Sequence, residues 1–299
     1  MKRTLNLRYL DAIARTGSIR KAAETLAITS TALNRRLLAM EDELGVQLFE
    51  RLPRGVRLST AGELMIHHIH SQMADLERVK SQIADLAGER RGHVAIACSQ
   101  ALLPYFLPEQ IARYRAEHPA VTFSVHLRDR DAAEQALADH SADIALVLEP
   151  VRFSAFATVM AVPQPVCAVM AAGHPLAQRP VLRLCDCQAY PVALPTAGYG
   201  VRHLLDQALA RASFALIPAI ESDSFEFLRR YPDYERMVTF QVPIGLPPPD
   251  QGGLVWRPVD GRDIRPAQLV LGQLRGRTLP VAAAKFADQL ARALAARYA

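Results

Sequence analysis

The sequence predicts a multidomain α+β protein with a small N-terminal domain, one long helix, and a larger C-terminal α/β domain of two lobes. Three observations support this fold class. Short helical patterns and a turn between two strand-like segments occupy residues 1–59, a narrow apolar stripe at helical spacing fills residues 60–89, and strands alternate with helices over residues 92–299. With 299 residues, half of them apolar, the chain can form two or more units with separate cores.

Three helices are expected at the N-terminus. The first ends near Thr16, where Gly17 interrupts the pattern, and Ser18 and Thr29 are expected to cap the second and third helices. Gly45 closes the third helix as the residue after its C-cap. The apolar residues at helical spacing are Leu5, Tyr9, Leu10 and Ile13, then Ile19, Ala22, Ala23 and Leu26, then Ala32, Leu33, Leu37, Met40 and Leu44. Two short helices, a tight turn and a longer helix indicate a helix-turn-helix.

A hairpin is expected after the third helix. Residues 47–51 and 57–59 have the character of short strands, and Pro53, Arg54 and Gly55 form a turn signal between them. A helix-turn-helix followed by such a hairpin is a winged helix-turn-helix.

Basic residues concentrate in this N-terminal part. Residues 1–60 contain eleven Lys and Arg against six Asp and Glu, whereas the other 239 residues contain twenty-four of each. The whole formal net charge of +5 therefore comes from the first fifth of the chain. This distribution is expected if only that part meets a polyanion.

One long helix should follow the hairpin. Thr60 and Glu63 form a Thr-x-x-Glu capping box, and the helix should extend to about Ala87. Its apolar residues follow one another at spacings of three and four: Ile66, Ile69, Met73, Leu76, Val79, Ile83 and Leu86. Because a narrow apolar stripe on a long helix needs a partner, we expect this helix to be a dimerising linker.

The remainder predicts two α/β lobes. Apolar strands are expected at 93–98, 121–127 and 144–148, with helices at about 101–117 and 131–140 between them, which indicates a parallel sheet. A second set of elements comprises strands near 165–171, 190–194 and 215–220 and a helix over about 200–212. A returning strand at 266–273 and a final helix at 280–298 complete the pattern. We therefore expect lobe I at about 92–161 and 267–299, lobe II at about 162–266, and a cleft between them.

The first 63 residues resemble the LysR-type transcriptional regulators. The matching segments are Leu7 to Ala12, Gly17-Ser18, Lys21 to Leu26, Ala32 to Arg35, Glu41 to Arg51 and Val56 to Glu63. The two-lobed pattern is similar to the periplasmic-binding-protein-like effector domain of that family. The third helix departs from the family, because Thr29 to Arg36 stand where many members have Ser-Gln-Pro-Ala-Val-Ser-Arg-Gln. In the second lobe, Arg229 to Pro232 replace the usual glycine-containing end of a helix.

The resemblance implies a cytoplasmic, DNA-binding transcriptional regulator. Its partners would be a pseudo-palindromic double-stranded operator, a second copy of the chain paired through the linker helix, and a small-molecule effector held between the lobes. Such regulators would act as a homodimer or as a homotetramer.

Candidate DNA-binding residues lie on the exposed side of the third helix and at nearby basic positions. Asn can pair with adenine and Arg with guanine in the major groove, while the hairpin tip can reach the minor groove or phosphates. The predicted residues are Arg20, Thr29, Ser30, Thr31, Asn34, Arg35 and Arg54. The alternative is a solvated helix face, with capping alone near the second helix.

Candidate effector-binding residues follow predicted strands, at the carboxyl ends where open α/β sheets bind ligands. They are Ser99, Gln100, Arg130, Thr196 and Tyr199. A helix N-terminus with hydroxyl and amide donors suits a carboxylate or another anion. Simple N-capping by Ser99, and an ion pair of Arg130 with Asp129, Asp131 or Glu134, are the alternatives.

Other function classes find little support. His67, His68 and His70 lie on different faces of one helix, and Cys185 and Cys187 lack a second ligand pair, so we expect no metal, and a solvated linker around the histidines. We also expect no cofactor, no catalytic residues and no enzyme, because Gly-x-Ser-x-Gly and Walker-type motifs are missing.

No export signal is recognisable, and prolines interrupt the apolar stretch Val159 to Gly173, which favours a chain with reduced thiols and no membrane segment. The competing hypotheses are a two-lobed binding protein or enzyme without a DNA-binding role, and a regulator that needs no effector.

Overall fold

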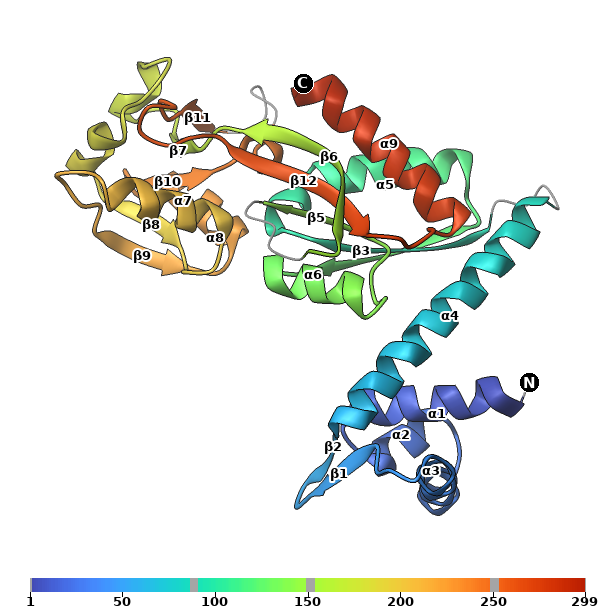
Figure 1. Ribbon diagram of the computed structural model, residues 1–299. Coiled ribbons are helices and arrows are strands. Elements are labelled where there is room, and N and C mark those ends of the chain that lie inside the picture. The colour runs from blue at the N-terminus through green and yellow to red at the C-terminus, as the bar shows by residue number, and fades with distance from the viewer. Residues whose placement is uncertain (1, 87–90, 149–153, 248–252, 299) are drawn as a thin grey trace. The chain divides into compact units, whose positions relative to one another are not determined.

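The computed structural model describes residues 2–86, 91–148, 154–247 and 253–298 (Figure 1). The chain divides into two compact units, one up to Val79 and one from Lys80 onward. We call them the N-terminal unit and the C-terminal unit. None of the described helices is both long and apolar enough to cross a membrane.

The N-terminal unit contains the predicted winged helix-turn-helix. Its elements are α1 (Lys2–Thr16), α2 (Ile19–Thr25), α3 (Ser30–Leu44), β1 (Phe49–Leu52), β2 (Gly55–Leu58) and the first part of α4 (Thr60–Leu86). Ser18 and Thr29 cap α2 and α3 as predicted, and Thr29 Oγ1 accepts a hydrogen bond from the amide of Ala32 at 3.2 Å. Gly45 ends α3 in the left-handed region, at φ +67°.

The hairpin of β1 and β2, which we call the wing, is anchored on the turn after α1. The two strands pair in antiparallel fashion from Phe49 opposite Leu58 to Leu52 opposite Gly55. The amide of Val56 donates to the carbonyl of Gly17 at 2.9 Å, so β2 starts against that turn. Gly55 has φ +113°, and a Cβ at this position would collide with the same carbonyl. Only glycine therefore allows the wing to approach the turn this closely.

Helix α4 is the predicted long helix. It is described to Leu86, so the expected end of the linker at 89 lies outside the described residues. Ile66 and Ile69 belong to the core of the N-terminal unit. Farther along the helix Leu76, Val79 and Ile83 are 42%, 41% and 62% exposed, so the second half of the predicted stripe is open to solvent within one chain.

Lobe I of the C-terminal unit is built on a five-stranded sheet in the order β4-β3-β5-β12-β6. Its elements are β3 (Gly92–Cys98), the short 3₁₀ helix η1 (Gln100–Leu102), α5 (Phe106–Glu117), β4 (Val121–Leu127), α6 (Arg130–Ala138), β5 (Ile144–Leu148), β6 (Phe156–Gln164), β12 (Ala267–Leu274) and α9 (Val281–Tyr298). Helices α5 and α9 lie on one face of the sheet and α6 lies on the other (Figure 1). Both faces are therefore covered, as the buried strands require.

One prediction for lobe I is confirmed and one is wrong in detail. β3 pairs in parallel with both β4 and β5, as predicted, and β12 runs antiparallel to β5 and β6, so the complete sheet is mixed. The helix expected over 101–117 is divided into η1 and α5, with Pro104 between them. Proline disfavours helical conformation in the residue before it and cannot donate a backbone hydrogen bond, which explains the break.

Lobe II has a second five-stranded sheet, in the order β11-β7-β10-β8-β9. Its strands are β7 (Cys167–Ala171), β8 (Val192–Pro195), β9 (Pro218–Ser222), β10 (Val238–Gln241) and β11 (Leu254–Pro258). Its helices are α7 (Gly200–Leu209), α8 (Phe225–Arg230) and the 3₁₀ segments η2 (Pro175–Gln178), η3 (Leu184–Ala189), η4 (Tyr231–Asp233) and η5 (Pro243–Gly245). Two crossings join the lobes, one from β6 to β7 and one from β11 to β12, and the amide of Val259 ties them together by donating to the carbonyl of Val166 at 2.8 Å.

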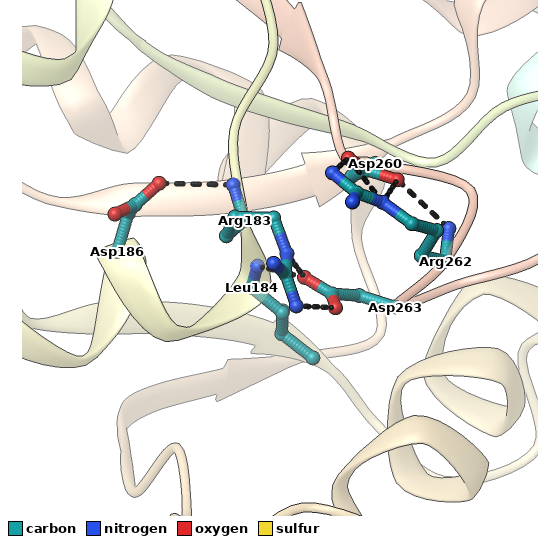
Figure 2. Close-up of polar contacts among 6 residues, drawn as sticks. All are labelled: Arg183, Leu184, Asp186, Asp260, Arg262 and Asp263. Carbon is teal, nitrogen blue, oxygen red and sulfur yellow. Dashed lines mark hydrogen bonds and ion pairs between the residues drawn. The ribbon is translucent and has the colours of Figure 1, made fainter.

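Salt bridges fix the second crossing to lobe II (Figure 2). The guanidinium of Arg183 donates to both carboxylate oxygens of Asp263, at 2.8 and 2.7 Å, and the amide of Leu184 donates to the same carboxylate at 2.8 Å. These hydrogen bonds hold the pKa of Asp263 below its usual value. Arg262 binds Asp260 in the same bidentate manner, which lowers the pKa of Asp260. These contacts have a structural role, because Arg183 pairs with Asp263 and Arg262 with Asp260, while Asp186 accepts from the amide of Arg183 and pairs with Arg179.

Candidate functional sites

The exposed side of α3 presents a short row of polar groups. Leu33 and Leu37 point into the core, while Ser30, Thr31 and Arg35 are exposed and Asn34 is half-buried. These four residues lie in the first turn and a half of α3, where a recognition helix meets base edges. Four of the seven predicted DNA-binding residues therefore lie on one surface.

The wing contributes a contact that sequence reasoning did not anticipate. Arg51, on β1, donates from Nη2 to Oδ1 of Asn34 at 3.1 Å. This bond fixes the orientation of the Asn34 amide and leaves its two N–H groups for another acceptor. The spacing of seventeen residues between the two side chains gives no local sequence signal for this pairing.

The remaining DNA-binding candidates differ in whether their side chains already have partners within the chain. Arg54 lies in the turn between β1 and β2 and is exposed, and no hydrogen bond or ion pair of its side chain is found among the described residues. Arg20 is exposed too, but its Nε lies 3.1 Å from the carboxylate of Glu24. Thr29 serves as the cap of α3, so the capping role and any DNA contact would share one hydroxyl.

A largely buried hydrogen bond joins α1 to α4 within the N-terminal unit. Nε2 of His70 lies 2.8 Å from Oδ1 of Asp11, and Arg15 reaches Oδ2 of the same carboxylate at 2.9 Å. Burial raises the pKa of Asp11, but the hydrogen bonds from His70 and Arg15 outweigh it and leave the pKa below its usual value. The expectation of a solvated linker is wrong for His70, whose side chain is 17% exposed. No group of three potential metal ligands occurs in the described part of the chain.

Three of the five predicted effector residues line a small cavity in the C-terminal unit. The cavity measures about 30 Å³ and is lined by Ser99, Arg128, Asp129, Arg130, Val147, Leu148, Gly198, Tyr199 and Gly200. Ser99, Arg130 and Tyr199 were expected there, because they follow β3, β4 and β8. Arg128, Val147 and Leu148 were missed, although their positions at the ends of β4 and β5 carry the same signal.

Arg130 and Thr196 have structural partners. The guanidinium of Arg130 lies 2.8 Å from the carboxylate of Asp131, which is one of the ion pairs weighed as an alternative to effector binding. The amide of Thr196 donates to the carbonyl of Ser222 at 3.1 Å and thereby extends the pairing of β8 with β9. Thr196 is half-buried and is not among the residues that line the cavity.

Gln100 connects the two lobes. Its Nε2 donates to the hydroxyl of Tyr199 at 2.9 Å and to the carbonyl of Asp223 at 2.5 Å, and its Oε1 accepts from the amide of Phe225 at 2.9 Å. Both N–H groups and the oxygen of the carboxamide are therefore in use. Tyr199 also donates to the carbonyl of Asp223, at 3.1 Å.

A larger cavity lies elsewhere in lobe II. It measures about 550 Å³ and is lined by Gln178, Pro180 and the edge strand β11. We consider it the weaker effector site, since it lies along a strand edge rather than at the carboxyl ends of parallel strands, where polar groups of several elements converge.

Comparison with known proteins identifies both parts of the chain. Residues 5–63 match the family described as bacterial regulatory helix-turn-helix proteins of the lysR family, and residues 87–295 match the LysR substrate binding domain. The RuBisCO operon transcriptional regulator of Allochromatium vinosum is 27% identical over 201 residues, which are 67% of this chain and 66%, just under two thirds, of that protein. The transcriptional dual regulator GltC of Bacillus subtilis is 26% identical over 224 residues, 75% of each chain.

Solved structures agree in fold. Full-length OxyR from Pseudomonas aeruginosa matches with a TM-score of 0.71 at 19% identity, covering 96% of this chain and 94% of that one. Full-length CbnR complexed with its target DNA matches with a TM-score of 0.65 at 16% identity, covering 97% of this chain and 99% of that one. Since the matched families together span the winged helix-turn-helix and both lobes, the chain belongs to the LysR family of transcriptional regulators.

Proposed function

We propose that this regulator binds a pseudo-palindromic operator through the polar face of α3 and the wing. The observation that carries the proposal is the placement of Ser30, Thr31, Asn34 and Arg35 on one exposed surface, in the part of the chain that holds all of the excess positive charge. Asn34, oriented by Arg51, would present N–H groups to base acceptors, and Arg35 would reach a guanine edge. Arg54 would enter the minor groove or contact phosphate, and Arg20 and Thr29 would contact the backbone.

In this proposal, two copies of the chain bind DNA together. The exposed apolar residues of α4 need a partner, and a second copy of the same helix supplies the same stripe. The homodimer would place two recognition helices on two half-sites, and two dimers would form the homotetramer. Such a regulator works in the cytoplasm, where DNA is accessible.

The effector in this proposal is a small molecule held between the lobes. Ser99, Gln100, Arg130, Thr196 and Tyr199 would bind it, and Arg128, which also lines the cavity, favours an effector with an anionic group. Its entry would change the angle between the lobes and thus how the DNA-binding units are spaced or how the operator is bent.

Fluorescence anisotropy with DNA upstream of the regulator's own gene tests the DNA-binding proposal. We expect Arg35→Ala to weaken specific binding about tenfold or more, as the loss of one base-edge contact does. Because each lost phosphate contact reduces the log–log salt slope by about 0.9, Arg54→Ala should lower the slope if it meets phosphate.

The matched control is Arg211→Ala, an exposed arginine just beyond α7 in the C-terminal unit. The DNA affinity of this variant and its salt slope should equal those of the unmodified protein. Equal binding by the Arg35→Ala and Arg211→Ala variants, on this DNA and on a library of genomic fragments, would contradict the assignment of α3 as the reading helix.

A further inference from the structure

Side chains join the two lobes next to the small cavity that Ser99 and Tyr199 line. Arg229 of α8 donates a hydrogen bond to the hydroxyl of Tyr105 in lobe I. Gln100 of η1 makes three hydrogen bonds to groups of lobe II.

Gln100 bonds to one group that has no partner in its own helix and to two groups that are also bonded to each other. The amide of Phe225 is the first of α8, and a first-turn amide has no acceptor within its own helix. Oε1 of Gln100 supplies that acceptor, while its two N–H groups reach Tyr199 and the Asp223 carbonyl. One side chain of lobe I thus satisfies three polar groups of lobe II.

The backbone around Gln100 holds it firmly in place. η1 passes so close to η5 that a Cβ on Gly245 would lie 3.1 Å from the carbonyl oxygen of Ala101. The first residue of η1 is Gln100, so its side chain starts from a segment already packed against lobe II. Rotation of the side chain alone would have to break all three hydrogen bonds.

We propose that Gln100 is an interlobe latch that fixes η1 of lobe I to the start of α8 in lobe II by binding Tyr199, Asp223 and Phe225. The latch rests on the proposed effector cleft, because an effector bound there by Gln100 or Tyr199 would have to exchange these hydrogen bonds for its own. It makes Gln100 a positioning residue for the two lobes. The groups it releases, an N–H and a carbonyl with a hydroxyl beside them, are complementary to a ligand group that carries a donor and an acceptor side by side, such as a carboxamide.

Hydrogen exchange of the full-length, ligand-free protein tests the latch. We expect Gln100→Leu, which keeps the size of the side chain but removes its hydrogen bonds, to speed exchange at the start of α8 about five- to tenfold, the net effect of losing one hydrogen bond. Gln207→Leu is the matched control, because Gln207 is exposed on α7, which belongs to lobe II as α8 does. Peptides from β3 and β5 should exchange at unchanged rates in both variants.

Equal exchange of the first turn of α8 in Gln100→Leu, Gln207→Leu and the unmodified protein would overturn the latch. If Gln100→Leu speeds exchange throughout the C-terminal unit, Gln100→Met decides instead, because its unbranched side chain matches glutamine in length and cannot accept strongly from the Phe225 amide. That variant should loosen the first turn of α8 and leave β3 protected, and unchanged protection of α8 would again refute the proposal. Operator binding measured in parallel reports on the DNA-binding proposal separately.

Discussion

At the scale of single residues, Gly62 determines how α4 approaches the wing. It lies in the first turn of α4, and a Cβ there would collide with the carbonyl oxygen of Leu48, just before β1. The amide of Ser59 donates to that same carbonyl at 2.9 Å, so it cannot move aside without losing a bond. The Ala61-Gly62 pair of the family motif thus has a steric cause in this chain.

Gly62→Ala should destabilise the N-terminal unit by about 1–3 kcal/mol, the usual cost of overpacking. Chemical denaturation followed by the circular dichroism of the helices measures the free energy of unfolding. Gly45→Asn is the control, because φ is +67° there, nothing lies within 4 Å of an added Cβ, and Asn tolerates the left-handed region. A larger loss in the control than in Gly62→Ala would show that the collision is not the cause.

Asp11 should make the stability of the N-terminal unit sensitive to acid. Its pKa in the folded protein is below the ordinary value of 3.8, so its contribution is complete above pH 4 and is lost as the pH falls through the folded pKa. Hydrogen exchange of α1 peptides at pH 5 and pH 3, corrected for intrinsic rates, measures this loss, and Asp11→Asn should make it smaller. Asp75→Asn, whose ion pair with Arg78 is exposed, should leave the pH dependence unchanged.

At the scale of secondary-structure elements, local signals predicted well and long-range pairing did not. Caps at Ser18 and Thr29 and the C-terminal glycine at Gly45 gave correct helix ends, because these residues satisfy the helix's own backbone. Strand β6 was missed, since Pro163 interrupts its pattern. It tolerates proline because it is an edge strand with one side free of partners.

The candidate functional sites show the same difference between local signals and long-range contacts. The exposed face of α3 could be predicted from helical spacing, and the cavity near Ser99 from the ends of strands. The contacts of Asn34 with Arg51 and of Gln100 with Phe225 could not, because their partners lie 17 and 125 residues away. The predicted domain boundaries, at residues 59, 89 and 92 and between the two lobes, stay predictions.

The exposed stripe of α4 predicts the behaviour of a linker mutant. Ile83→Asp places a charge at a position that is 62% exposed in a single chain and that the dimer would bury, so the variant should shift from dimer toward monomer. Analytical ultracentrifugation over a concentration series measures the change. Glu77→Ala, at an exposed position on the opposite side of α4, should sediment as the unmodified protein does.

At the scale of the whole molecule, two DNA-binding units on one operator should leave a periodic footprint. Hydroxyl-radical cleavage should show protected patches separated by about one helical turn of 10–10.5 base pairs, or a multiple of it. The Ile83→Asp variant should lose this spaced pattern at concentrations where the dimer is disrupted. A single uninterrupted patch with the unmodified protein would argue against paired recognition helices.

The position of β12 in its sheet has a consequence for synthesis of the protein. β12 lies between β5 and β6 and bonds to both, yet the whole of lobe II separates it from them in the sequence. On the ribosome, β5 and β6 therefore emerge with open edges and must wait until lobe II has been translated. Lobe II can fold as a unit during that interval, whereas lobe I closes last, so its unpaired strands are the part of the nascent chain most exposed to aggregation and to chaperones.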